Sequence, residues 1–149
     1  MGKCYLLSGL SEEAVAEVAG IAEFGTMLAG ETLTEAGEKG SDLFIVLDGR
    51  VVINTKGGDK LADAGPGSVL GEIALVDDQP RSATAVCAGL VRYARLPAKD
   101  LRAYMAKNKE TGFAMLANLA RVLSMRLRQT DHALEMLHDK SRDPWEHSF

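Results

Sequence analysis

The spacing of apolar residues divides the chain into three parts, and the first part is a short helix. Ser11 is a typical helix N-cap, and Glu12 and Glu13 place negative charge in the first turn. Apolar residues then recur at helical spacing, at Ala14, Val15, Val18, Ile21 and Ala22. We therefore predict a short helix that begins at Ser11.

From Gly25 onward, short apolar runs alternate with glycines, which is typical of strands joined by turns. The runs at residues 43–47 and 50–53 flank Asp48-Gly49, so they predict a two-residue β-hairpin. A further turn is expected at residues 56–59, and further strands are expected at residues 84–88 and 91–96. This part of the chain predicts a small antiparallel roll or barrel.

Beyond Pro97 the only glycine is Gly112, and good helix formers continue to Lys140. Two helices are predicted, over residues 98–106 and 110–139. The longer one carries apolar residues at alternating spacings of three and four, which is a heptad pattern. We call this set the heptad stripe: Phe113, Leu116, Ala120, Leu123, Leu127, Thr130, Leu134 and Leu137.

Two interpretations of the heptad stripe remain open. Its first half could pack on the roll while the rest forms an ordinary amphipathic helix. However, a helix of about 40 Å is longer than one small roll can cover, so Leu127, Leu134 and Leu137 need another partner. We therefore favour a parallel homodimer through this helix, in which Thr130 weakens the coiled coil and could set its register.

The expected fold is α+β: a small antiparallel β-roll, resembling a jelly-roll barrel, flanked by an N-terminal helix and two C-terminal helices, the last one long. The chain has 149 residues, of which 46% are hydrophobic and 26% charged. These values suit a single domain over residues 1–149 and argue against a two-domain enzyme. The roll is expected at about residues 25–97 and the C-terminal helices at about residues 98–140.

The net charge of −4 is unevenly distributed. Residues 1–80 hold 5 basic and 14 acidic side chains, whereas residues 81–149 hold 12 and 7. The acidic total argues against non-specific nucleic-acid binding, while the basic second half can accept a small anion or an acidic partner.

Cys4 and Cys87 are too few and too far apart for a disulfide framework, and we expect both to be reduced. The N-terminus lacks the apolar run of a signal peptide, and no stretch has the length of a membrane span. A cytoplasmic protein without membrane contact is the expectation.

Residues 67–85 contain the most informative chemistry. Gly71 permits close backbone approach, and residues 72–75 can form one helical turn whose free N–H groups point toward an anion. Arg81 could form a bidentate pair with a phosphate, and Ser82 could add a donor. Glu72 would repel phosphate but could accept hydrogen bonds from a ribose. These residues together describe a nucleotide site, whereas a surface salt bridge between Glu72 and Arg81 is the plainer alternative.

Two short sequences in this segment resemble the phosphate-binding cassette of cyclic nucleotide-binding domains. They are Leu70-Gly71-Glu72-Ile73-Ala74-Leu75 and Pro80-Arg81-Ser82-Ala83-Thr84, at the separation usual in that family. Residues 29–31, 37–38 and 42–51 are also similar to the family. We refer to residues 70–84 as the cassette. The resemblance implies a β-roll flanked by helices that binds cyclic AMP or cyclic GMP.

The same resemblance implies roles for individual residues. Glu72 would hold the ribose 2′-hydroxyl and Arg81 the cyclic phosphate. The same pocket would be lined by Gly71, Ile73, Ala74, Ser82 and Ala83. Structural glycines would be Gly37, Gly49, Gly67 and Gly71.

Two further points follow from the resemblance to catabolite activators within this family. Ser82 favours cyclic AMP, because some members selective for cyclic GMP carry threonine after the cassette arginine. Residues 126–131 resemble a stretch whose hydroxyls meet the adenine across a dimer, so Thr130 would contact the base. Asp131 differs from the residue at the matching position of that stretch. The alternative is that Thr130 is an ordinary threonine of the heptad stripe and does not contact the base.

The expected function is a non-enzymatic cyclic-nucleotide sensor that repacks its C-terminal helices and acts on a partner in trans. The alternative is a ligand-independent homodimerisation scaffold with a vestigial cassette. A cupin-type metalloenzyme is disfavoured, because His132, His138 and His147 lie in the C-terminal helix and tail rather than on strands. Direct DNA binding is not expected, since residues 140–149 are too few for a helix-turn-helix reader.

Overall fold

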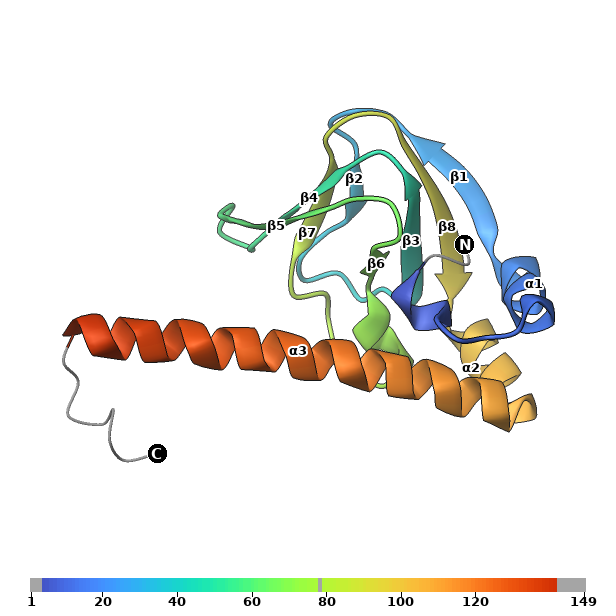
Figure 1. Cartoon of the computed structure of the whole chain (residues 1–149). Helices are drawn as coiled ribbons and strands as arrows, with labels where there is room; N and C mark the ends of the chain where they lie inside the picture. Colours follow the sequence, from blue (N-terminus) through green and yellow to red (C-terminus); the bar gives the residue numbers. More distant parts are fainter. Residues whose placement is uncertain (1–3, 78, 142–149) are drawn as a thin grey trace.

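The computed structural model describes residues 4–77 and 79–141. Two antiparallel sheets of four strands form a roll (Figure 1), with strand orders β1-β8-β3-β6 and β2-β7-β4-β5. The strands are β1 (Glu23–Met27), β2 (Thr32–Thr34), β3 (Asp42–Asp48), β4 (Val51–Asn54), β5 (Lys60–Ala64), β6 (Val69–Leu70), β7 (Thr84–Cys87) and β8 (Val91–Pro97). The expected α+β fold and its antiparallel roll are confirmed.

Helices lie at one end of the roll, and the longest, α3, extends well past it (Figure 1). The helical segments are η1 (Tyr5–Leu7), α1 (Glu12–Ile21), η2 (Glu72–Leu75), α2 (Ala98–Lys107) and α3 (Lys109–Ser141). Ser11 is the N-cap of α1 as expected, because its hydroxyl accepts a hydrogen bond from the Ala14 N–H at 3.1 Å. Residues 142–149, which include the tail considered for DNA binding, lie outside the described residues.

The prediction of a β-hairpin around Asp48-Gly49 is wrong. Strand β3 pairs with β6 and β8, whereas β4 pairs with β5 and β7, so the chain changes sheet at this point. Gly49 has φ +90°, and a Cβ there would collide with the Leu90 carbonyl oxygen. The β3–β4 corner therefore packs on the β7–β8 connection, and this long-range packing overrides the local turn signal.

Other local expectations agree better with the structure. A turn does join β4 to β5 at residues 56–59, and it is closed by a 2.7 Å hydrogen bond from the Thr55 N–H to the Asp59 carbonyl. The glycines expected to be structural all have positive φ, namely Gly37, Gly49, Gly67 and Gly71. Strands β1, β2, β5 and β6 were not predicted. Strands β2 and β6 are only three and two residues long, and the mostly exposed or half-exposed residues of β1 and β5 show no alternation of apolar and polar positions.

The hydrophobic core consists of two clusters on either side of the sheet β1-β8-β3-β6. One cluster fills the interior of the roll around Phe44, Val46 and Val51. The other joins the outer face of that sheet to the helices, through Leu43 and Ile45 of β3 and Leu101 of α2. Cys4 and Cys87 are free, and each is buried in a different cluster.

Most of the heptad stripe lies outside the face by which α3 packs on the rest of the molecule, and half-buried Leu123 is the exception. The buried residues near the start of α3 are Gly112, Met115, Asn118 and Leu119. Phe113 and Leu116 remain exposed by 75% and 43%, on a face rotated by about a quarter-turn. The first half of α3 therefore packs on its neighbours and still leaves the heptad stripe largely free.

Asn118 connects α3 to the N-terminal segment through hydrogen bonds. Its buried amide donates hydrogen bonds to the carbonyl oxygens of Leu6 and Ser8, at 3.0 and 2.9 Å. Replacing Asn118 with alanine leaves these acceptors unpaired, and we expect it to lower the free energy of unfolding by about 1–3 kcal/mol. Urea unfolding checks this, with Gln129→Ala on an exposed part of α3 as the control. If Asn118→Ala and Gln129→Ala have equal free energies of unfolding, the stabilising role of the Asn118 hydrogen bonds is contradicted.

Candidate nucleotide-binding site

A cavity of about 540 Å³ lies between the cassette, the strands β4 and β5, and α3. This volume is within the range of small-molecule sites. Most of its wall comes from the cassette, and Arg126 of α3 adds a residue distant in sequence. Outside the cassette the lining residues are Thr34, Gly40, Ile53, Leu61, Ala62, Val69, Ala85 and Arg126.

The first part of the cassette turns sharply into η2, a single helical turn. Gly71 precedes it with φ +77°, and a Cβ at this position would lie 2.8 Å from the Asp42 carbonyl oxygen. Only glycine fits this conformation without strain. The first N–H groups of such a turn have no acceptor within it. The predicted turn over residues 72–75 is therefore present, and it lies at the cavity wall.

Arg81 is held in place by its backbone and its side chain. Its N–H donates to the Glu38 carbonyl at 2.9 Å, and its own carbonyl accepts from the Gly37 N–H at 2.8 Å. Its guanidinium donates to the Asp42 carbonyl at 2.9 Å and lies 5.9 Å from the centre of the Phe44 ring. Burial lowers the pKa of Arg81, while Asp42 and Glu38 act in the opposite direction. The cation remains protonated at neutral pH.

Two glycines leave room for the Arg81 guanidinium. A Cβ at Gly40 would lie 2.5 Å from Nη2, and a Cβ at Gly71 would collide with Nη1. Gly71 was predicted from the sequence to be a site residue, whereas Gly40 was not. The signal available for Gly40 was its place in the glycine-rich stretch that includes Gly37.

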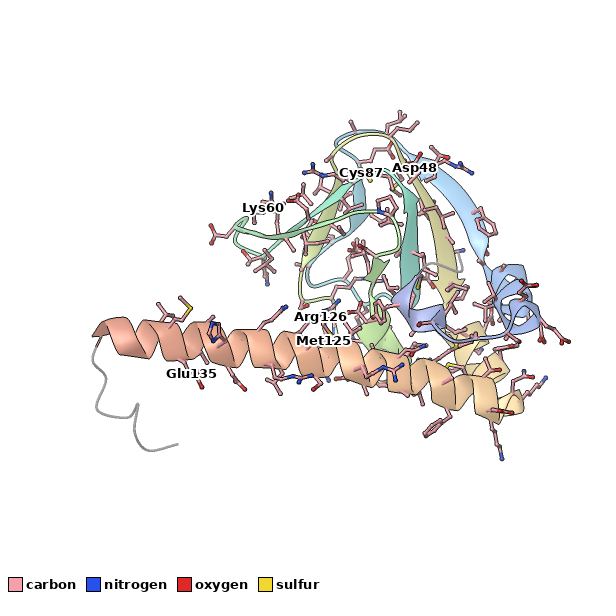
Figure 2. All side chains as sticks on the ribbon, viewed as in Figure 1. Asp48, Lys60, Cys87, Met125, Arg126 and Glu135 are labelled. Atoms are coloured by element: carbon pink, nitrogen blue, oxygen red, sulfur yellow. The ribbon has the colours of Figure 1, made fainter. Side chains whose placement is uncertain are left out.

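Glu72 is only 6% exposed and forms an ion pair with Arg126 of α3. Figure 2 shows Arg126 where α3 passes the roll, on the side of the helix toward it. The plainer alternative of a salt bridge between Glu72 and Arg81 is not what the described residues form. A buried carboxylate needs a partner, and in this structure the long helix supplies it.

The structure brings seven of the eight predicted site residues to the cavity, namely Gly71, Glu72, Ile73, Ala74, Arg81, Ser82 and Ala83. Thr130 lies one turn beyond Arg126, is exposed, and does not line this cavity. Its hydroxyl donates to the Arg126 carbonyl at 3.1 Å. Arg126 itself was noted only as part of a similar stretch, because its pairing with Glu72 depends on how α3 lies across the roll.

Both C-terminal helices, α2 and α3, contact η2. Arg102 of α2 donates a hydrogen bond to the Ala74 carbonyl at 2.6 Å, at the end of the turn opposite Glu72. Arg126 of α3 binds Glu72 at its beginning. A displacement of η2 therefore changes contacts to α2 and to α3 together.

Residues 26–108, more than half of the chain, match the family described as the cyclic nucleotide-binding domain. The chain belongs to this family. Domains of this family bind cyclic nucleotides, and the residues that resemble the family's cassette line the cavity described above.

The curated relatives are longer than this chain. "Glutaminase 2" of Bradyrhizobium diazoefficiens is 28% identical over 92% of the chain, which spans 22% of that protein. The "CRP-like cAMP-activated global transcriptional regulator" of Mycobacterium tuberculosis is 32% identical over 70% of the chain, which spans 47% of that protein.

Among solved structures, the catabolite activator protein of Thermus thermophilus is similar to this chain, with a TM-score of 0.78 and 31% identity. The alignment covers 89% of this chain and 62% of that protein.

Neither a metal site nor a membrane span is found in the described part of the chain. Within residues 4–77 and 79–141, no group of three or more His, Cys, Asp or Glu side chains could hold a metal ion. No helix in these segments combines the length and apolarity needed to cross a bilayer.

The space at Gly40 makes a testable prediction. Gly40→Ala would place a methyl group against the Arg81 guanidinium, so the guanidinium would have to move. We expect the affinity for a cyclic nucleotide to fall about fivefold to tenfold while the melting temperature changes little. Gly65→Ala is the control, because a Cβ there would meet nothing within 4 Å. Unchanged affinity in Gly40→Ala, measured by isothermal titration, would contradict the close contact between Gly40 and the Arg81 guanidinium.

Proposed function

We propose that this chain is a regulatory sensor domain whose ligand is cyclic AMP in preference to cyclic GMP. The observation that carries the proposal is the placement of Glu72 and Arg81 on one cavity. Arg81 offers two donors to the cyclic phosphate, and the first N–H groups of η2 add further donors. Glu72 accepts hydrogen bonds from the ribose hydroxyl.

The rest of the cavity suits a purine base. Beyond the polar residues, its wall is formed by Ile53, Leu61 and Ala62 of β4 and β5. Such apolar side chains can cover the faces of a flat ring. The preference for cyclic AMP is supported by Ser82 after the cassette arginine, and by the printed name of the mycobacterial relative. Thr130 as a base contact would require a second copy of α3, or a different position of this helix.

We expect η2 to transmit the effect of nucleotide binding to the C-terminal helices. When the phosphate draws η2 inward and a ribose hydroxyl binds Glu72, the contacts to Arg126 and Arg102 change. Both C-terminal helices then repack, and the ligand shifts the equilibrium by its different affinity for the two arrangements.

The exposed heptad stripe supports a homodimer through α3. Leu127, Leu134 and Leu137 are 62%, 49% and 60% exposed, although leucine on a helix is normally buried. With 33 residues, α3 is about 50 Å long, and Figure 1 shows its second half beyond the roll. An effector that recognises the repacked helices would be the partner in trans.

The alternative is a scaffold that dimerises without a nucleotide. A scaffold needs neither Arg81 nor Glu72, so the presence of both at the cavity favours the sensor.

Isothermal titration of nucleotide-free protein distinguishes these functions, with cyclic AMP, cyclic GMP and 5′-AMP as ligands. A sensor gives saturable heat with cyclic AMP, weaker binding of cyclic GMP and still weaker binding of the ring-opened 5′-AMP. Absence of heat and an unchanged melting temperature with all three nucleotides would support the scaffold.

A further inference from the structure

Asp42, at the start of β3, presents two different oxygen acceptors to two different arginines. Its carbonyl accepts a hydrogen bond from Arg81 Nη2 at 2.9 Å. Its carboxylate forms an ion pair instead with Arg95 Nη1 of β8, at 2.6 Å. Arg95 is held from its other side by Glu23 of β1. Among the described residues, Arg81 therefore contacts a neutral oxygen, and the nearby carboxylate is paired elsewhere.

The sheet register explains this arrangement. Arg95 lies directly opposite both Phe44 of β3 and Glu23 of β1. Asp42 is two residues before Phe44, so its side chain projects from the same face of the sheet. The guanidinium of Arg81 lies over the Phe44 ring, on that face. The Asp42 carboxylate thus contacts Arg95 and also lies near enough to Arg81 for its charge to act on the pKa of Arg81.

A free carboxylate at this position would interfere with anion binding. Carboxylates form charge-assisted, bidentate pairs with guanidinium groups that are stronger than a bond to a neutral carbonyl. A carboxylate on the same chain would also compete at a high effective concentration. If it occupied Arg81 for nine-tenths of the time, the apparent Kd for the phosphate would rise about tenfold.

We propose that Arg95 is a positioning residue that holds the Asp42 carboxylate away from Arg81 and so keeps the Arg81 cation available for the ligand phosphate. The assignment rests on the proposed role of Arg81 in phosphate binding. Arg95 itself does not line the cavity, so its effect on the ligand passes through Asp42.

The test compares cyclic AMP affinities of the full chain and its variants by isothermal titration. Arg95→Gln should raise Kd about tenfold. The double variant Arg95→Gln with Asp42→Asn should return to within about twofold of wild type, because the neutral amide no longer competes for Arg81. Arg95→Lys, which keeps a cation beside Asp42, should also bind nearly normally. A merely structural role of Arg95 would not be rescued by changing Asp42.

Two control variants separate Asp42 from the other carboxylates nearby. Glu23→Gln removes the second partner of Arg95 and should leave the affinity unchanged. Glu38→Gln, introduced into Arg95→Gln, removes the other acidic side chain acting on Arg81 and should not restore binding. Wild-type affinity in Arg95→Gln, or persistent weakness after Asp42→Asn is added, would overturn the proposal.

A ligand-free measurement separates failure of this proposal from failure of the proposed function. A double-mutant cycle of Asp42→Asn and Arg81→Ala, measured by urea unfolding, reports the coupling between the two side chains. We expect weak coupling when Arg95 is present, from the charge of Asp42 acting on Arg81, and a clearly stronger stabilising coupling in the Arg95→Gln background. Coupling no stronger in that background than in the presence of Arg95 would refute the role of Arg95, even if the wild-type protein bound no nucleotide. If wild type fails to bind but the coupling appears, the positioning role stands and the assignment of the ligand is wrong.

Discussion

Arg81→Ala is expected to weaken cyclic AMP binding by at least about tenfold, because a charged hydrogen bond contributes about 1.5–3 kcal/mol and a tenfold change in Kd corresponds to about 1.4 kcal/mol. The guanidinium is already confined by Gly40, Gly71 and the Phe44 ring. Little ordering is then needed when the phosphate arrives, which favours a large loss on its removal. Isothermal titration measures the effect directly.

Comparison variants make this result specific to the phosphate contact. Arg92→Ala removes an exposed arginine of β8 and should bind normally. Glu72→Gln should weaken binding less than Arg81→Ala, since an amide oxygen still accepts a hydrogen bond from a hydroxyl. Arg81→Lys keeps the charge but not the planar fork and should fall between wild type and alanine. Unchanged affinity in Arg81→Ala, with an unchanged melting temperature, would remove this residue from the phosphate site.

Leu127→Glu combined with Leu134→Glu is expected to convert a dimer into monomers at micromolar concentration. Each leucine buried between two helices contributes about 1.5–3 kcal/mol, and the substitutions remove two such residues from each subunit. They also place like charges against each other across the interface. Sedimentation velocity of the intact chain gives the oligomeric state, and circular dichroism shows whether α3 remains helical.

The control for the dimer prediction changes charge elsewhere on the same helix. Arg128→Glu lies outside the heptad stripe and should leave the dimer intact. If the wild-type chain sediments as a monomer at micromolar concentration, the heptad stripe is not a homodimer interface. If the double leucine variant remains dimeric, the subunits associate through another surface.

Local patterns predicted those features whose causes lie within a few residues. The N-cap at Ser11, the turn at residues 56–59 and the boundary at Pro97 each depend on neighbouring side chains or backbone preferences. The cassette could be found because the residues around Gly71 and Arg81 that resemble the family's phosphate-binding segment lie close together in the sequence. Edge strands such as β5 were missed, because an exposed strand carries little apolar alternation.

Three features depended on residues far apart in the chain. The β3–β4 connection changes sheet because Gly49 packs against Leu90 of another connection. The face by which α3 packs is decided by Met115, Asn118 and Leu119, and the regular heptad spacing concealed this second face. Glu72 pairs with Arg126 rather than with Arg81, since α3 crosses the cavity at that point.

Residue patterns alone were enough to predict the class of fold, the position of the cassette and the presence of a long helix with a heptad stripe. Propensity, spacing and short motifs act over a few residues and can be recognised without coordinates. Which carboxylate meets which arginine became clear from the folded chain, because Asp42, Arg81 and Arg95 lie on separate strands and loops. Charge pairing depends on distances of a few ångströms between such segments, and those distances are set by the sheet register and by the packing of α3.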